Sequence, residues 1–585
     1  MSGFVARLRG RRLDLAHGQV HHAVSARMQV LYDGHVAVPP AQLRAWGLPA
    51  GTPTPECLAQ AWRRLGWGMV KQLGGAWCAA LLDEATGELL LMHDALGVQD
   101  LFHAWQDDAL LVASSLEGLL LADPRREVDD DYLSETLADI DDHDGKTAWR
   151  HIRRLEQGLG ACGRDGRLVA VRTYTPDRRA GTAALPDQDL AEALREQMVE
   201  AVRACLPAEG KVWCELSGGL DSSSVLAIST GVLGAAVETF SVIYDRSSAS
   251  DERRWMDEML RAWPVPTHRL DADTVAPFST LPMRFLPEPT GHALVCAFDD
   301  ERARRLAEAG VDVVLTGMCG DAVFLGDSPQ PAYLADLRNP ARLWRELGLW
   351  ARESPEQRPW TYWLLLHVLR PRLGHPSAQQ ARQTPPPWLA PRHVRSQAGA
   401  PRRTAAGPGL GHGDGWYWQR LLKAARLARG GQQHLGAAGL FRNPWLHLPL
   451  VEFMASVPWS SKLQPGLDRP LQRQAMQGLL PEPVRTRTDK GTPTQALLNG
   501  LHEADRWADW LTRDARLVQR GDVEPVAWQH AVHLARHGIC TNPGSFLQAC
   551  MLEAWWRCLP LAPAARDDAW RPALPEPAAP ALEAA

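Results

Sequence analysis

The most constraining feature of this chain is a polar, glycine-containing segment that directly follows a short, mostly apolar run. Residues 212–216 are typical of a buried strand, and Ser217-Gly-Gly-Leu-Asp-Ser-Ser223 comes next. Two glycines allow a tight turn, and the hydroxyls add donors at the N-terminus of a helix that we expect to start near Ser222. The segment therefore predicts a strand, an anion-binding loop and a helix.

The composition of this loop indicates the kind of phosphate site. It contains no lysine, so it differs from the P-loop pattern that holds terminal phosphates. Asp221 can instead hold Mg²⁺ against a polyphosphate. The alternative is an ordinary Gly-Gly turn with Ser and Asp at a helix start, where these residue types are common.

A second loop of the same kind follows another apolar run, residues 311–315, and ends at Asp321. Because ligands bind at the carboxyl ends of parallel strands, we expect Thr316, Gly317 and Asp321 to lie beside the first loop. Mg²⁺ takes one or two protein carboxylates and completes its shell with phosphate oxygens and water. Asp221 and Asp321 are therefore the predicted metal ligands.

The pattern of strands and helices divides the chain into two parts joined by a linker at 175–188, which contains Pro, Gly and Asp. Short apolar runs predict a β-rich first part, with strands at 29–32, 77–82, 89–92, 110–114 and 168–171. From residue 189 to about 560, apolar runs alternate with amphipathic helices, which predicts a parallel sheet covered by helices.

Two segments lack a hydrophobic period. Residues 371–415 are rich in Pro, Gln, Arg and Gly, and we expect a mobile loop there. Residues 561–585 are rich in Pro and Ala, which predicts a disordered tail. Helices are expected at 416–458 and at 470–498.

Composition argues against several classes of protein. The formal net charge of -5 gives no basic field that would recruit nucleic acid. The chain shows no signal peptide and no apolar run long enough to span a bilayer, so we expect a cytoplasmic protein without a membrane partner. The 10 cysteines are scattered with no Cys-x-x-Cys pair, which favours reduced thiols over a zinc site.

Residues 217–223 and 316–321 resemble the two ATP loops of the N-type ATP pyrophosphatases, in particular the asparagine synthetase-like group. Members cut ATP between the α and β phosphates, so the resemblance implies that a carboxylate is adenylated and then attacked by an amine. Segments of the first part resemble the glutaminase-like domain of asparagine synthetases. The resemblance implies an α/β protein with a degenerate glutaminase-like (Ntn-type), β-rich α+β sandwich domain over 1–175 and a parallel-sheet ATP-pyrophosphatase domain with C-terminal helices over 189–560.

A third segment, residues 481–491, resembles the loop whose lysine stabilises charge on the α-phosphate, and Lys490 is the matching residue. The implied catalytic residues are Lys490, Asp321 and Asp221. The implied nucleotide-binding residues are Ser217, Gly218, Gly219, Leu220, Asp221, Ser222, Ser223, Val242, Thr316 and Gly317.

The chain departs from the group at several positions. Cys319 replaces the middle glycine of the second loop, Ala322 replaces the following Glu, and His447 stands where an acid is usual. Glu252 and Glu288 resemble acidic elements of the group. For both, a role in the site and simple complementarity to a helix dipole are equally good explanations.

The source of the amine separates the subgroups. Glutamine-hydrolysing relatives use an N-terminal Cys, where this chain has Ser2, and residues 30–80 hold no Asn-Gly-Glu-like pocket element, so ammonia is not the expected substrate. β-Lactam synthetases usually carry a Tyr at the position of Met318. Lasso-peptide cyclases use a peptide α-amine, which needs no strong base because its pKa is near 8, and residues 487–491 resemble theirs.

The resemblance implies a macrolactam synthetase of lasso-peptide biosynthesis. It would use ATP and Mg²⁺ to adenylate an Asp or Glu side chain of a precursor peptide, and the N-terminal amine would then close an isopeptide ring. A leader-peptide protease is the implied partner. A β-lactam synthetase-like enzyme, a true asparagine synthetase and a non-catalytic nucleotide-binding scaffold remain open alternatives.

Overall fold

A computed structural model gives the structure of most of the chain. The described residues are 3–10, 12–23, 27–123, 125–139, 143, 145–164, 167–176, 186–326, 331–373, 385–394, 410–432, 440–491, 493–561 and 571–572. Ser2 and most of the predicted linker, mobile loop and tail therefore lie outside the described residues. No helix in the described part combines the length and the apolar character needed to cross a bilayer.

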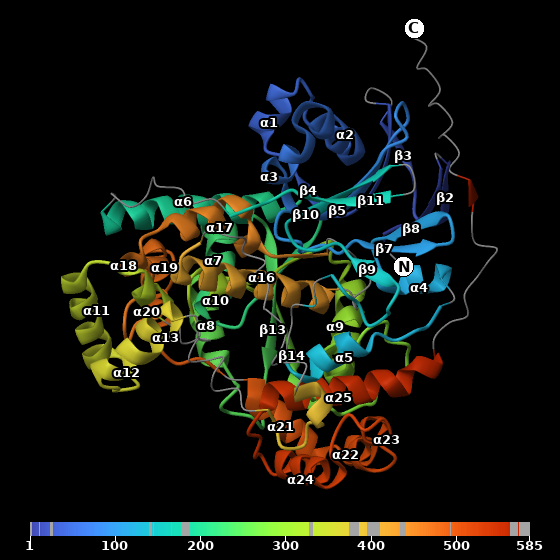
Figure 1. Cartoon of the computed structure of the whole chain (residues 1–585). Helices are drawn as coiled ribbons and strands as arrows, with labels where there is room; N and C mark the ends of the chain where they lie inside the picture. Colours follow the sequence, from blue (N-terminus) through green and yellow to red (C-terminus); the bar gives the residue numbers. More distant parts are fainter. Residues whose placement is uncertain are drawn as a thin grey trace.

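Two six-stranded antiparallel sheets form the N-terminal part of the molecule (Figure 1). One has the order β17-β2-β1-β8-β7-β9 and the other β11-β10-β6-β5-β4-β3. Apolar side chains from both sheets share one core, as the predicted sandwich requires. The strands are β1 Val5–Arg9, β2 Arg12–His17, β3 His21–Ala23, β4 Met28–Ala37, β5 Gly74–Asp83, β6 Leu89–His93, β7 Phe102–Gln106, β8 Ala109–Ala113, β9 Ile152–Arg154, β10 Leu159–Arg164, β11 Arg167–Arg172 and β17 Arg571–Pro572.

Five short helices accompany these strands. They are α1 Pro40–Ala45, α2 Thr54–Leu65, α3 Met69–Gln72, α4 Leu116–Ala122 and α5 Asp130–Leu137. The predicted strands of this part are all present, and β4 and β5 are longer than the apolar runs that identified them. These two strands pair over their full length, from Met28 opposite Asp83 to Ala37 opposite Gly74, so pairing extends them beyond their apolar runs.

A five-stranded sheet of order β14-β13-β12-β15-β16, parallel throughout, forms the centre of the second part. This confirms the predicted parallel sheet. Its strands are β12 Val212–Glu215, β13 Val237–Ile243, β14 Thr267–Asp271, β15 Val313–Leu315 and β16 Phe441–Arg442. The helices that follow or precede them are α6 Asp187–Cys205, α7 Leu220–Ala227, α8 Arg253–Ala262, α9 His292–Ala309 and α10 Gly320–Val323. In the register, Cys214 lies between Thr239 and Leu315, so β12 and β15 end side by side.

Helices were predicted over 416–458, and the structure has two α-helices there but places a strand between them that was not predicted. The chain forms α16 at His412–Gln432 and α17 at Leu448–Ser456, and between them β16 adds an edge strand in which Phe441 pairs with Val314. A strand of two residues is too short to show the alternation of apolar and polar residues that identifies a strand. Its sequence therefore could not be told apart from the helical segments around it.

The prediction of a mobile loop over 371–415 was wrong for part of that segment. Trp388 and Leu389 are buried, Leu389 pairs with Val523, and the Trp388 and Trp528 rings meet edge to face at 5.0 Å. A local group of apolar side chains thus anchors this part to the C-terminal helices. Similarly, Arg571–Pro572 of the predicted tail form β17 and pair with β2.

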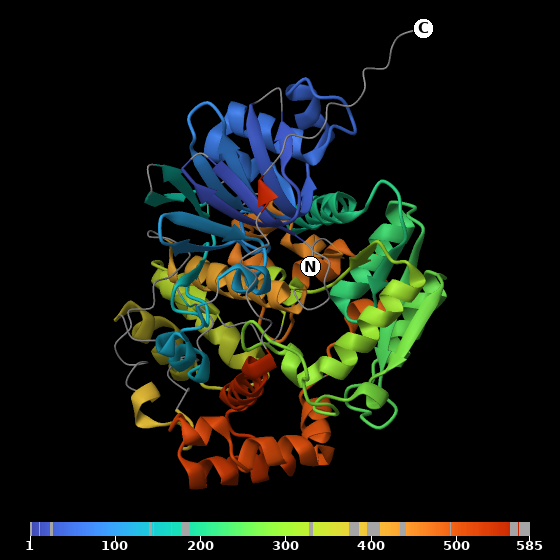
Figure 2. The same cartoon turned by 90° about the vertical axis from the view of Figure 1, so that its right-hand side faces the viewer.

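The C-terminal helices lie at the end of the molecule away from the N-terminal sandwich (Figures 1 and 2). They are α21 Pro493–Glu503, α22 Asp505–Thr512, α23 Arg516–Gln519, α24 Pro525–Arg536 and α25 Pro543–Cys558. α25 also packs on α5, and the Trp149 and Trp555 rings lie 5.8 Å apart. The last long helix therefore ties the two parts of the chain together.

A buried ion cluster makes a second connection between the two parts. The Arg154 guanidinium contacts Asp100 at 2.8 Å and Glu288 at 2.6 Å, and Arg429 contacts Asp100 at 3.0 Å. Asp100 and Arg154 belong to the N-terminal part, and Glu288 and Arg429 to the second. Glu288 is thus an interdomain contact, which accounts for this acid without a role in the cavity.

Candidate active site

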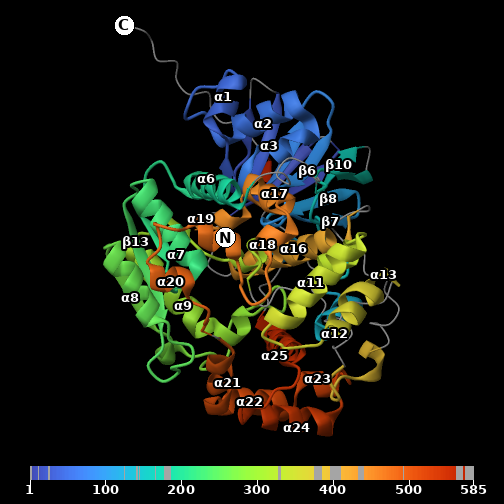
Figure 3. The same cartoon turned by 90° about the vertical axis from the view of Figure 1, so that its left-hand side faces the viewer.

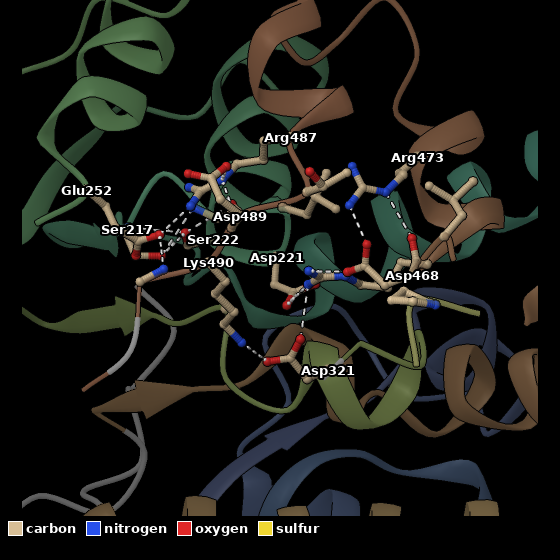
Figure 4. A pocket seen from close by; sticks show the side chains of 18 of the residues that line it. Ser217, Asp221, Ser222, Glu252, Asp321, Asp468, Arg473, Arg487, Asp489 and Lys490 are labelled. Carbon is tan, nitrogen blue, oxygen red and sulfur yellow. Dashed lines mark hydrogen bonds and ion pairs between the residues drawn. The ribbon is translucent and has the colours of Figure 1, made fainter. Parts of the chain in front are cut away.

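The two predicted loops meet at the carboxyl edge of the parallel sheet, where β12 and β15 end. They border a cavity of about 790 Å³, within the range of about 300–1,000 Å³ that is usual for ligand pockets. Figure 4 shows the side chains around it. Gly320 permits the close approach of the loops, because a Cβ there would lie 2.2 Å from Asp221 Cγ.

The first loop is held by its own hydroxyl groups. The Ser217 amide donates to Ser222 Oγ at 3.2 Å, the Ser217 and Ser222 hydroxyls lie 3.0 Å apart, and the Gly219 amide donates to Ser217 Oγ at 3.3 Å. α7 begins at Leu220, two residues earlier than predicted, because Gly219 takes the N-cap position. The positive end of the helix dipole therefore lies at the cavity.

Most of the predicted site residues line the cavity. They are Ser217, Gly219, Leu220, Asp221, Ser222, Val242, Gly317, Asp321 and Lys490. Three others are not among its lining: Gly218 accepts a hydrogen bond from Arg487, Thr316 accepts one from the Met318 amide, and Ser223 is fully buried. The structure thus brings the three segments together, and the roles of the individual residues remain predictions.

Asp221 and Asp321 are joined by an arginine that the sequence analysis missed. Arg469 Nη1 lies 2.9 Å from Asp221 Oδ2 and 3.1 Å from Asp321 Oδ1, and Lys490 Nζ lies 2.5 Å from Asp321 Oδ2 (Figure 4). Gln472 donates to Asp221 Oδ1 at 2.9 Å. Two carboxylates, a guanidinium and an ammonium thus form one connected cluster.

Burial dominates the protonation of this cluster. It raises the pKa of Asp221 to about 6, Arg469 opposes that rise, and the neighbouring Asp321 adds to it.

Arg469 has no motif around it and precedes the short helix α19 Pro470–Ala475 with a left-handed φ of 52°. The adjacent charges of Asp468 and Arg469 are its one signal in the sequence, and such pairs are common on surfaces.

The donor set fits a magnesium ion that is shared with phosphate. The described residues contain no group of three His, Cys, Asp or Glu side chains that could hold a metal. Mg²⁺ needs only one or two protein carboxylates when phosphates and water supply its other ligands. Asp221 and Asp321 meet that requirement, since a carboxylate oxygen can accept more than one interaction.

The lysine-bearing segment is fixed to the first loop by a buried arginine. Arg487 donates to Glu252 Oε1 at 2.7 Å and to the Gly218 carbonyl at 3.0 Å, and its guanidinium lies 4.7 Å from the Trp255 ring centroid. Glu252 also accepts from the Gly491 amide at 3.2 Å. Glu252 therefore holds the segment that presents Lys490.

Three residues that differ from the pattern of the asparagine synthetase-like group, Met318, Cys319 and His447, lie in different surroundings. Met318 lines the cavity and is 43% exposed. Cys319 adopts a left-handed φ of 69°, and burial raises the pKa of its thiol to about 12. His447 lies beside Gly74 of the N-terminal part, and burial lowers the pKa of its ring. His447 is thus at the interface of the two parts and not among the described cavity residues.

The antiparallel sandwich, the parallel sheet and the paired loops define a protein of the asparagine synthetase-like ligase class. The family described as asparagine synthase matches residues 193–557, and the glutamine amidotransferase domain matches residues 50–174. The chain belongs to the asparagine synthase family. The expected fold class, with an Ntn-type amidotransferase domain before the parallel sheet, and the expected family are thereby confirmed.

Several curated proteins are similar to this chain. Amidase chry2 of Gibberella zeae is 26% identical over 314 residues, and amidase chyE of Penicillium rubens is 25% identical over 324 residues. These matches cover 49% and 51% of this chain but only 45% and 46% of the two amidases. A glutamine-hydrolyzing asparagine synthetase 3 of Bacillus subtilis is 23% identical over 446 residues, which cover 72% of this chain and 68% of that protein.

Proposed function

We propose that this protein is an ATP-dependent amide ligase that adenylates a side-chain carboxylate of a precursor peptide and closes a macrolactam with the peptide's N-terminal amine, releasing AMP and pyrophosphate. The observation that carries the proposal is the cluster of Asp221, Asp321, Arg469 and Lys490 beside the hydroxyl-rich loop. It combines donors for a pyrophosphate with acids for its metal ion.

The loop, the two acids and Lys490 have separate roles in the proposed reaction. The amides and hydroxyls from Ser217 to Ser222 bind the leaving pyrophosphate at the start of α7. Asp221 and Asp321 would hold Mg²⁺, which would neutralise charge on the phosphates when it is bound. Lys490 stabilises the charge that develops on the α-phosphate and then on the tetrahedral intermediate, because a positioned cation favours the transition state over the ground state.

The amine partner follows from what stands at Met318. Its thioether lines the cavity and cannot accept a proton from an amide nitrogen. A peptide α-amine has a pKa near 8 and is a competent nucleophile near neutral pH without such a base. Holding this amine against the acyl-adenylate supplies the main rate advantage, and the cavity must keep water from the adenylate. A protease that frees the N-terminus is the partner that we propose.

The experiment is an incubation with ATP, Mg²⁺ and peptides that have a free N-terminus and one internal Asp or Glu. We expect a product that has lost one water, AMP in equal amount, and no such product from peptides with an acetylated N-terminus. Formation of the product from acetylated peptides would contradict the proposed nucleophile.

A second candidate, asparagine formation, is favoured by the similarity to asparagine synthetases along 72% of this chain. It predicts that aspartate with glutamine or ammonia supports AMP release and yields asparagine. The same product analysis separates the two candidates, since the peptide reaction yields no asparagine. A non-catalytic scaffold would bind nucleotide without AMP release.

A further inference from the structure

The cavity has a second arm that lies beyond the phosphate-binding loops. Its lining continues onto α11 Pro340–Glu353, α12 Trp360–Leu364 and the π-helix η6 Leu365–Leu369. Figure 3 shows these helices across the molecule from β13 and α8. The arm thus faces the loops from a separate part of the chain.

The aromatic side chains that line the arm are Trp350, Tyr362, Trp363 and His367, and the segment between α11 and α12 adds Ser354, Pro355 and Glu356 to the lining. The Trp350 and Trp363 rings lie 5.2 Å apart, and His367 stacks on Trp363 at 5.3 Å with an interplanar angle of 30°. Aromatic faces of this kind bind apolar and aromatic groups. π-Helical turns are frequent at functional sites, and this one carries His367.

Hydrogen bonds hold Trp350 in place, and burial confines Trp363 beside it. Trp350 Nε1 donates to the Tyr333 hydroxyl at 3.2 Å, and that hydroxyl donates to Glu346 Oε2 at 3.0 Å. Trp350 and Trp363 are only 5% and 3% exposed. A wall that is fixed before binding loses little entropy when a ligand arrives.

The lysine and arginine side chains that line the cavity all lie outside the aromatic arm. The lysine and arginine residues among its described lining are Arg469, Arg473, Arg487 and Lys490. Each of the four pairs with a carboxylate: Asp468 for Arg473, Glu252 for Arg487, and the loop acids for the other two. Arg358, 3.9 Å from Glu356 and 5.5 Å from the Tyr362 ring centroid, is not part of the described lining.

We infer that the aromatic arm binds an uncharged aromatic or aliphatic group next to the activated carboxylate, so that the acyl substrate is a substituted or peptide-bound acid and not free aspartate. This inference rests on the proposed function and names its substrate class. A free aspartate would bring an α-carboxylate into an arm whose described lining contains no lysine or arginine, and whose one carboxylate, that of Glu356, would repel it. Burying a carboxylate without a partner is unfavourable by several kcal/mol.

The experiment compares acyl substrates by ATP–pyrophosphate exchange, which reports adenylation alone. The probes are free aspartate and four sets of peptides with a free N-terminus and one internal Glu or Asp, in which the residue before the acid is Phe, Leu, Lys or Asp. We expect the Phe and Leu sets to have a kcat/KM at least ten-fold above the Lys and Asp sets and above free aspartate.

Variants of the arm give the second readout. Tyr362→Ala is expected to raise the KM for the Phe set about ten-fold and to leave the KM for ATP unchanged. Tyr362→Arg adds a cation at a half-buried position and is expected to shift the preference toward the Asp set. Trp344→Ala is the matched control, because Trp344 lies on the same helix α11 as Trp350 but is 53% exposed.

Two kinds of failure can be told apart. Equal or better use of free aspartate, or unchanged substrate preference in both Tyr362 variants, overturns the inference while adenylation itself persists. Release of ADP and phosphate, or no exchange with any probe, overturns the proposed function and the inference with it.

Discussion

At the scale of single residues, the two cations of the site differ in how firmly they are held. The Arg469 side chain is 8% exposed and bridges both acids, whereas the Lys490 side chain is 47% exposed and pairs with Asp321. Arg469 therefore keeps two carboxylates together in the folded protein. Because its flexible ammonium is half exposed, Lys490 is the cation that we propose to follow charge onto the α-phosphate.

Lys490→Ala tests this difference between the two cations. We expect turnover to fall on the order of 10²-fold or more, because a cation aimed at developing charge is lost, while ATP still binds. Steady-state kinetics and nucleotide-binding titrations measure the two effects. Lys423→Ala, which removes an exposed lysine of α16, should change neither. Near-normal turnover of a purified Lys490→Ala protein would remove the assignment.

A buried lysine outside the site gives a prediction about stability. Lys462 lies 4.2 Å from the Trp459 ring centroid, donates to the Met454 carbonyl at 3.1 Å, and burial lowers its pKa to about 8 from 10.5. The unfolded chain therefore binds this proton more tightly than the folded protein does. The resulting destabilisation is complete below pH 8 and disappears as the pH rises toward 10.5.

Between pH 8 and pH 10.5, we expect the free energy of unfolding of the wild type to rise by about 3 kcal/mol relative to that of Lys462→Met. The size follows because each unit of pKa shift corresponds to about 1.4 kcal/mol. Urea unfolding of both proteins across this pH range measures the difference. A difference that does not vary with pH would mean that Lys462 keeps its ordinary pKa.

At the scale of elements, the site is made by loops that follow neighbouring strands and depend on close backbone contacts. Gly218 has a φ of 74°, and a Cβ there would lie 2.5 Å from Trp255 Cβ and 2.8 Å from the Met256 amide nitrogen. The first loop therefore rests directly on α8, which also begins next to Glu252. A change at Gly218 would move the loop as a unit.

Gly218→Ala is expected to weaken ATP binding at least ten-fold, because the added Cβ pushes the loop off α8, and to lower stability by about 2 kcal/mol or more through strain and overpacking. Gly234→Ala is the matched control: its φ is 62°, and a Cβ added there would have no neighbour within 4 Å. It carries the same backbone strain without the clash. Equal ATP affinities of the two variants would contradict this account of the loop.

The sequence predicted the features that depend on local signals and missed those that depend on residues far away in the chain. Both loops and their strands were predicted because Ser217 to Ser223 and Gly317 to Asp321 are local signals at strand ends. The approach of Lys490 was expected only because residues 481–491 resemble a segment of the family. Arg469 was missed because it acts through two residues more than a hundred positions away in the chain. β16 was missed because two residues carry no period, and its pairing depends on β15.

At the scale of the whole molecule, buried contacts couple the two parts of the chain. The cluster of Asp100, Arg154, Glu288 and Arg429 joins the two parts by ion pairs, and burial lowers the pKa of Arg429 to about 10. A buried ion cluster of this kind fixes geometry more than it adds stability. Removing one member is nevertheless severe, because a charge is left unpaired.

Arg154→Met is expected to lower the free energy of unfolding by about 3 kcal/mol, since Glu288 loses its partner. Adding Glu288→Gln should recover part of that loss. Arg150→Met is the control, because Arg150 pairs with Glu127 and both side chains are more than half exposed, so a change of at most about 1 kcal/mol is expected. Urea unfolding measures all of them, and equal effects of the Arg154 and Arg150 changes would argue against a buried coupling.

The proposed function requires a carboxylate to attack the α-phosphorus of ATP in this cavity. Phosphorus NMR of a reaction with ATP, Mg²⁺ and an acid-containing peptide identifies the phosphorus that is attacked. We expect AMP and pyrophosphate in equal amounts, formed only when the carboxylate is present and strongly reduced in Lys490→Ala. ADP and orthophosphate as the products would contradict the proposed function.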